Sequence, residues 1–145
     1  MTSTNVSALE RSLQKTQIWI GDIATEMGWS DTERGYTALR AVLHTLRDRL
    51  PPEEAVDLAA QLPMVVRGFY YEGWKPSNTP LKFRHKDEFI SRVRADAPAL
   101  AAEEAERAVT AVFHQLSTKL DLGEVEQVRD SMPEEVRALW PIEGL

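Results

Sequence analysis

The sequence predicts an all-α protein made of two copies of a four-helix unit. When the chain is aligned with itself so that Ala38 falls on Ala108, ten positions of the segment 38–70 are identical to their counterparts in 108–140. Average residue usage would give roughly two or three identities over that length. Apolar residues recur at helical steps of three and four, and no segment alternates apolar and polar residues long enough for a strand. We therefore expect about eight short helices, packed as one compact domain around a pseudo-twofold axis.

The duplication divides the chain into four segments. We expect a polar tail at 1–8, a first helical repeat at 9–74, a basic connector with prolines at 75–86, and a second repeat at 87–145. Each repeat alone would be marginally stable at about 60–70 residues, so the two should bury an apolar face against one another.

The first repeat contains the signals of four helices. Apolar residues from Leu9 to Met27 favour one helical face, and Gly28 is a typical helix end. Ser30 and Glu33 form a capping box for a second helix. That helix carries an apolar stripe of Tyr36, Leu39, Leu43, Leu46 and Leu50. Pro51 and Pro52 end it, a third helix runs from Glu53 to about Gln61, and Pro63 opens a fourth from Met64 to about Glu72, before Gly73.

The second repeat reproduces this order with different residues in the same roles. Asp87 is expected to cap a helix that contains Phe89, Ile90 and Val93. A longer helix is expected from roughly Ala101 to Leu120, with Val109, Phe113 and Leu116 in its stripe. Asp121 and Glu124 form a further capping pair, and Ser131, Pro133 and Glu134 open a last helix that ends in Leu139 and Trp140.

Composition and charge exclude several classes of protein. The chain is 43% hydrophobic and 28% charged, as in ordinary globular proteins, and it has no cysteine for disulfides or thiolate sites. No apolar run approaches the length of a transmembrane helix and the segment from Met1 to Ala8 is polar, so we expect a cytoplasmic protein without membrane contact. The net charge is −6, but the segment 75–86 carries four basic and no acidic side chains. Nucleic-acid binding is therefore disfavoured outside this connector.

Three stretches resemble a known bacterial family: AVLHTLRDRLPPEEAVDLAAQLP from Ala41, RGFYYEGW ending at Trp74, and MPEEVRALW ending at Trp140. The chain resembles the family catalogued as domain of unknown function 2267, from about Trp19 to Trp140. The resemblance implies a small helical protein of bacterial cytoplasm. It implies no established reaction, ligand or catalytic residue.

His44 and His114 occupy equivalent positions and are weak candidates for a transition-metal site. Only Asp48 lies one turn after His44, and its counterpart is Thr118, so the ligand set is not duplicated. The alternative is structural, with each ring packed and hydrogen-bonded to a loop carbonyl or a helix end.

Three further duplicated pairs are expected to be structural: Arg67 and Arg137, Glu54 and Glu124, and Pro63 and Pro133. The arginines could instead clamp an anion, because a guanidinium offers a planar fork of donors. The structural interpretation pairs Arg67 with Glu54 and Arg137 with Glu124. Each glutamate is already explained by its place in the first turn of a helix.

The aromatic and basic residues around the connector are the best site candidate in the sequence. Tyr71 and Trp74 are not explained by the duplication, and they are followed by Lys75, Lys82, Arg84 and Lys86. Aromatic rings beside cations are typical of partner, nucleic-acid or anion sites. The alternative is a rigid turn fixed by Trp74, with the cations in solvent.

No enzyme signature is present, so we expect no catalytic residues and no cofactor. The leading hypothesis is a non-catalytic module that binds a partner protein or its own copy. A second hypothesis is a small-ligand or metal site between the repeats, near His44 and His114. A third is weak nucleic-acid or anion binding through the connector.

Overall fold

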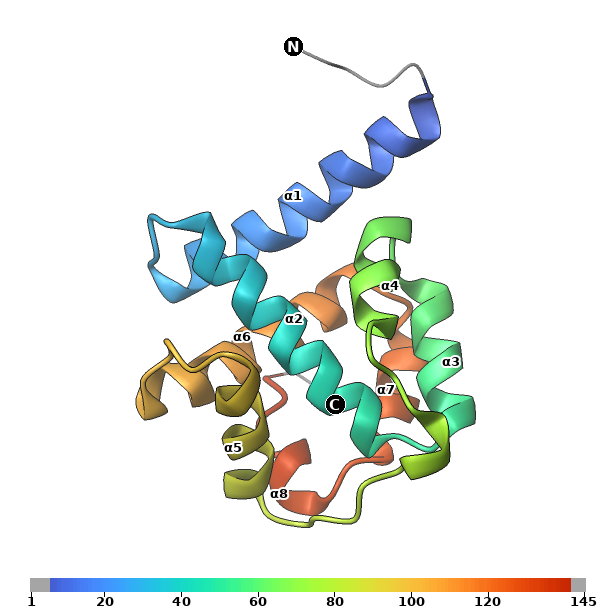
Figure 1. Cartoon of the computed structure of the whole chain (residues 1–145), viewed down its shortest axis with the longest axis vertical. Helices are drawn as coiled ribbons and strands as arrows, with labels where there is room; N and C mark the ends of the chain where they lie inside the picture. Colours follow the sequence, from blue (N-terminus) through green and yellow to red (C-terminus); the bar gives the residue numbers. More distant parts are fainter. Residues whose placement is uncertain (1–5, 142–145) are drawn as a thin grey trace.

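The computed structural model describes residues 6–141 of the 145-residue chain. These residues form eight α-helices and one short 3-10 helix and contain no strand, so the all-α prediction is confirmed (Figure 1). The elements are α1 (Ser7–Met27), α2 (Thr32–Arg49), α3 (Pro52–Gln61), α4 (Met64–Tyr71), η1 (Pro76–Asn78), α5 (Lys86–Asp96), α6 (Ala102–Lys119), α7 (Leu122–Asp130) and α8 (Glu134–Arg137).

Here α1–α4 are called the first half and α5–α8 the second half. In the alignment of the chain with itself, α2 and α6 begin and end at equivalent positions, and α3 and α7 begin at equivalent positions. The largest difference is in the first helix of each half, because α1 has 21 residues and α5 has 11. Each half therefore has the same order of elements, with a longer first helix in the first half.

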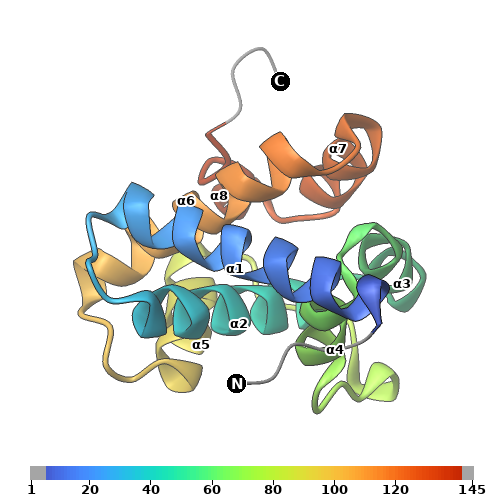
Figure 2. The ribbon, with the colours of Figure 1, turned by 90° about the horizontal axis from the view of Figure 1, so that it is seen from above.

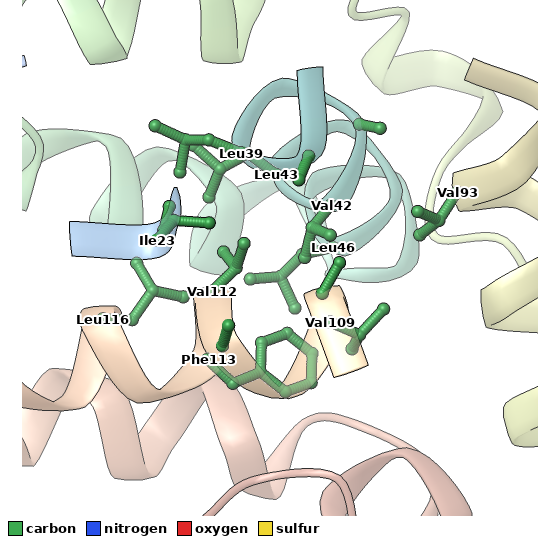
Figure 3. Close-up of a cluster of buried hydrophobic side chains, with 14 of the residues drawn as sticks. Ile23, Leu39, Val42, Leu43, Leu46, Val93, Val109, Val112, Phe113 and Leu116 are labelled. Carbon is green, nitrogen blue, oxygen red and sulfur yellow. The ribbon is translucent and has the colours of Figure 1, made fainter. Parts of the chain in front are cut away.

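The two halves share one core. Helix α1 packs on α2 and also on α6, α5 packs on α6 and also on α2, and α3 contacts α7 (Figure 2). Side chains from α1, α2, α5 and α6 meet in this core, among them Ile23, Leu39, Val93 and Val112 (Figure 3). Helix α1 thus contacts α6 of the second half, and α5 contacts α2 of the first half.

The last aromatic residue of the second half also belongs to the core. The ring of Trp140 stacks on Phe113, with ring centroids 3.8 Å apart, and its Nε1 donates to Ser117 Oγ at 2.9 Å. The corresponding aromatic residue of the first half, Tyr70, is fully buried and donates its hydroxyl to the Ala55 carbonyl at 2.8 Å.

Several expected helix ends differ from those observed. Asp31, not Ser30, caps α2, because its carboxylate accepts from the Glu33 amide at 2.8 Å. Helix α5 begins at Lys86, so its N-cap is His85 and not Asp87. The Glu88 carboxylate accepts a hydrogen bond from the His85 amide at this end of the helix. The Asp121 cap of α7 is confirmed by its hydrogen bond from the Glu124 amide at 3.1 Å.

Other differences concern residues at the edges of elements. Helix α1 begins at Ser7, inside the expected tail, whose residues 1–5 lie outside the described part. Ser131 ends α7 and does not open α8, which has only four residues. Tyr36, expected in the buried stripe of α2, is 38% exposed.

Within residues 6–141, none of the helices has the length and apolar character needed to span a bilayer.

Candidate functional site

The aromatic residues before the connector pack onto the protein. Tyr71 and Trp74 are both partly buried against the core, and their ring centroids lie 5.3 Å apart. The amide of Leu81 donates to the Asp48 carbonyl at 2.8 Å, which attaches the connector to the end of α2. Both rings therefore pack inward, and the connector is attached to α2 by the Leu81 hydrogen bond.

Within the described residues, no cation of the connector lies over the ring of Tyr71 or Trp74. Lys86 lies 3.4 Å from the Glu106 carboxylate, whereas Lys75, Lys82 and Arg84 are exposed and form no ion pair within residues 6–141. Arg84 lies close enough to Arg49 that its charge adds to the effect of burial, and together they lower the pKa of Arg49.

The two arginines at equivalent positions of the self-alignment bind carbonyl groups, and the expected pairs with Glu54 and Glu124 are not formed. Arg67 donates to the carbonyl oxygens of Ala59 and Leu62, each at 2.9 Å. Arg137 donates to the Met132 carbonyl at 3.3 Å. These carbonyls lie at the ends of α3 and α7, where helical partners are missing, so both arginines act as caps. Pro63 and Pro133 precede the next helices, α4 and α8, as predicted.

The two glutamates at equivalent positions, Glu54 and Glu124, lie close to each other instead. Carboxylate oxygens of Glu54, Asp57 and Glu124 all lie within 4.8 Å of one another at the contact between α3 and α7. Burial and the neighbouring charges of Glu54, Asp57 and Asp121 raise the pKa of Glu124. This is the only group of three metal-capable side chains in residues 6–141, and it includes neither histidine.

His44 lies at the wall of a polar cleft between the two halves. Its Nε2 lies 2.6 Å from the Phe69 carbonyl oxygen, near the end of α4. A carbonyl only accepts hydrogen bonds, so Nε2 is protonated and donates to it, while Nδ1 lies on the side of α5. Nδ1 lies 3.4 Å from the Asp96 carboxylate on α5. His44 thus makes the expected helix-end hydrogen bond and also contacts the second half.

Arg47 lies one turn further along α2 and is only 4% exposed. One guanidinium nitrogen donates to the carbonyls of Tyr70 and Glu72, both at 2.7 Å, and Nε donates to Asp48 at 2.8 Å. The last carbonyls of a helix lack partners and carry partial negative charge, which a guanidinium neutralises. Arg47 therefore fixes the end of α4 against α2.

The cleft has a volume of about 350 Å³ and lies between α2, α5 and the end of α4. Its charged lining consists of Arg40, Arg47, Arg92, Asp48, Glu72 and Asp96, with His44 among them. Arg40 is paired with Glu72 at 3.1 Å. Arg92 is exposed on α5 and makes no hydrogen bond or ion pair within residues 6–141. One guanidinium of the cleft is thus available to a ligand.

His114 lies in a different environment. Its Nδ1 lies 2.9 Å from the Glu26 carboxylate on α1, which also accepts from the Gln115 side chain at 3.0 Å. The bond to a carbonyl or helix end that was expected is replaced by this carboxylate contact. The two histidines therefore face separate acids and do not belong to one ligand group.

Sequence reasoning found His44 but missed its neighbours. Arg40, Arg47 and Arg92 look like ordinary surface charges of helices, and Asp96 is far away in sequence. One signal was present: in the alignment of the chain with itself, the three arginines correspond to Thr110, Ser117 and Asp22, so they are not part of the repeated pattern.

The comparisons with known proteins define a family. A family model with the description "Uncharacterized conserved protein (DUF2267)" matches residues 16–139. No curated protein matches the chain.

Proposed function

The chain belongs to the DUF2267 family, and from the geometry of the cleft we propose that it binds a small anionic molecule between its two halves. The ligand class is a compact molecule with a carboxylate or phosphate group. A guanidinium binds such groups through two parallel hydrogen bonds. This role belongs to a binding protein and requires no chemical step.

Arg92 carries the proposal. It is exposed at the wall of the cleft without a partner in residues 6–141, whereas Arg40 and Arg47 are held by Glu72 and Asp48. A guanidinium has five N–H donors in a fixed plane, and those of Arg92 are free to meet an acceptor that enters the cleft.

The second half provides an internal comparison. We infer that the halves are copies of one unit, related by a pseudo-twofold axis, because His44 with Asp96 and His114 with Glu26 are equivalent contacts in the self-alignment. At the second contact the three arginines are absent. The second contact joins α6 and α1, the counterparts of α2 and α5, and Asp22 stands there in the place of Arg92, so packing of this kind does not require Arg92.

The charge of the cleft favours a small ligand. Asp48, Glu72 and Asp96 balance the three arginines, and the chain as a whole carries −6. A polyanion would be repelled by the rest of the surface, whereas a molecule with one or two charges meets mainly the lining.

The experiment is a titration at low ionic strength with inorganic phosphate and with malonate as probes, followed by NMR. We expect saturable shifts for residues of the cleft, and Arg92→Asp, the residue found at the equivalent position 22, should weaken binding at least tenfold. Lys82→Asp is the matched control, because it makes the same change of charge on the connector. An unsaturable response, or an equal loss in both variants, contradicts the proposal.

The same control tests the connector hypothesis. A loss confined to Lys82→Asp would move the anion site to the exposed connector cations. The hypothesis of a protein-interaction module concerns a different surface, on the outer side of α1.

A further inference from the structure

The outer side of α1 carries an apolar face. Leu9 and Leu13 are 42% and 46% exposed, and Ile20 is partly buried two turns further along. Spacings of four and seven positions place the three side chains on one side of the helix. The α1 face is defined here as Leu9, Leu13 and Ile20 together with Tyr36 of α2.

A hollow of about 600 Å³ adjoins this face between α1 and the start of α2. It is lined by Gln17, Ile20, Thr32, Glu33 and Tyr36. The Tyr36 ring is held at its edge by Phe69 of α4, with ring centroids 5.6 Å apart and planes at 84°. The hollow therefore has one aromatic wall, Tyr36, which packs on Phe69.

Within the described residues, the second half has no exposed apolar face at the corresponding place. The counterparts of Tyr36 and Gln17 are Glu106 and Asp87, and Glu106 is engaged by Lys86. The counterpart of Leu13 is Phe83, which packs against the core. Helix packing of this kind thus does not require an exposed apolar face, so the apolar residues of α1 need another explanation.

Within residues 6–141, the only charged residue that lines the hollow beside the α1 face is acidic. Glu33 lines the hollow and no basic side chain does. Glu10 lies next to Leu9, and neither glutamate side chain forms an ion pair within residues 6–141. A complementary surface has an apolar stripe with cations beside it.

We propose that the α1 face binds a cationic amphipathic helix of a partner protein. A helix laid along an apolar groove buries residues at steps of three and four, and its lysines or arginines would meet Glu10 and Glu33. The distance from Leu9 to Ile20 along α1 is about 16 Å at about 1.5 Å per residue, which corresponds to three turns of a partner helix. This surface is independent of the cleft at His44.

The probe is a labelled peptide of leucine and lysine that is amphipathic as a helix, titrated with the full chain by fluorescence anisotropy. A peptide of the same composition in scrambled order is the control for simple charge attraction. We expect the amphipathic peptide to bind at least tenfold more tightly, with NMR shifts at α1 and the start of α2.

Tyr36→Glu tests the surface with the residue that the second half carries at this place. It should weaken peptide binding at least tenfold and keep the helical circular dichroism spectrum. Val56→Glu is the matched control, because Val56 is 47% exposed on α3, away from the α1 face. Arg92→Asp should leave peptide binding unchanged, which separates this proposal from the cleft.

Three results would overturn the inference. The scrambled peptide could bind equally well, or Tyr36→Glu and Val56→Glu could have the same effect. Alternatively, sedimentation could show a dimer that Tyr36→Glu dissociates, in which case the occupant is a second copy of the chain.

Discussion

The carboxylates of Glu54 and Glu124 meet across the contact between α3 and α7, although the two residues belong to different halves of the chain. Each has a buried oxygen, Oε2, without a hydrogen-bond partner in residues 6–141. Asp57 adds a third carboxylate within 4.8 Å. Negative charge at this contact is unfavourable to folding, because buried charges of the same sign repel one another and lose hydration.

Replacing Glu124 with glutamine should therefore stabilise the protein at neutral pH, because the amide carries no charge beside Glu54 and Asp57. The pKa of Glu124 is raised above 4.5 in the folded state, so this state retains the proton longer than the unfolded state. The loss of stability caused by the ionised Glu124 is absent below the ordinary pKa of a glutamate and grows as the pH rises through the raised pKa of the folded state. Thermal unfolding of both proteins from pH 4 to 8 measures the difference.

Glu126→Gln is the control for this prediction, since Glu126 is exposed on the same helix. It should shift the unfolding temperature little at any pH. A constant difference between Glu124→Gln and the wild-type protein across the whole pH range would show that Glu124 is not the titrating group.

His44 and His114 should differ in their contribution to stability. His44→Ala removes a buried ring and leaves the Phe69 carbonyl without its side-chain donor, which should cost about 2–3 kcal/mol. His114→Ala removes a partly exposed contact to Glu26 and should cost less than about 1 kcal/mol. Urea denaturation of the two variants provides the comparison. Equal losses would contradict the assigned hydrogen bond.

The helices of this protein could be predicted because their signals are local. Proline before a helix, glycine after it and apolar residues at steps of three and four predict elements without knowledge of the partner surfaces. The end at Gly28 and the Asp121 cap illustrate this. Errors arose where two neighbouring residues could serve as the cap, as with Ser30 and Asp31, because only the backbone conformation selects between them.

The cleft could not be predicted because its residues come from helices that are distant in the sequence. His44 was selected because it is duplicated, but Arg92 and Asp96 enter the cleft only through the packing of α5 on α2. Trp74 shows the same limit. An aromatic residue beside cations is found both in binding sites and in packed turns, and here its ring is partly buried against the core.

The connector is fastened to the last helix by an ion pair that can be titrated. A hydrogen bond from His85 to Glu135, with Nδ1 and the carboxylate 3.0 Å apart, raises the pKa of His85 above 6.5. The resulting stabilisation is complete below the ordinary pKa and is lost as the pH rises through the raised value. Glu135→Gln should lower the pKa of His85 toward 6.5 in an NMR titration. An unchanged pKa would show that the contact is not formed in solution.

Gly35→Ala should destabilise the protein, although alanine normally stabilises a helix interior by about 1 kcal/mol relative to glycine. A Cβ at Gly35 would lie 2.7 Å from the Ile20 carbonyl oxygen, so α1 would have to move away from α2. We expect a net loss of about 1–3 kcal/mol, as for other overpacked sites. Gly21→Ala is the matched control, because a Cβ there meets no atom within 4 Å, and it should stabilise slightly.

The movement of α1 away from α2 in Gly35→Ala would also displace Ile20 from Tyr36. Gly35→Ala should therefore weaken binding of the amphipathic peptide, whereas Gly21→Ala should not. Stabilisation by both substitutions would show that α1 and α2 are not in close contact at Gly35.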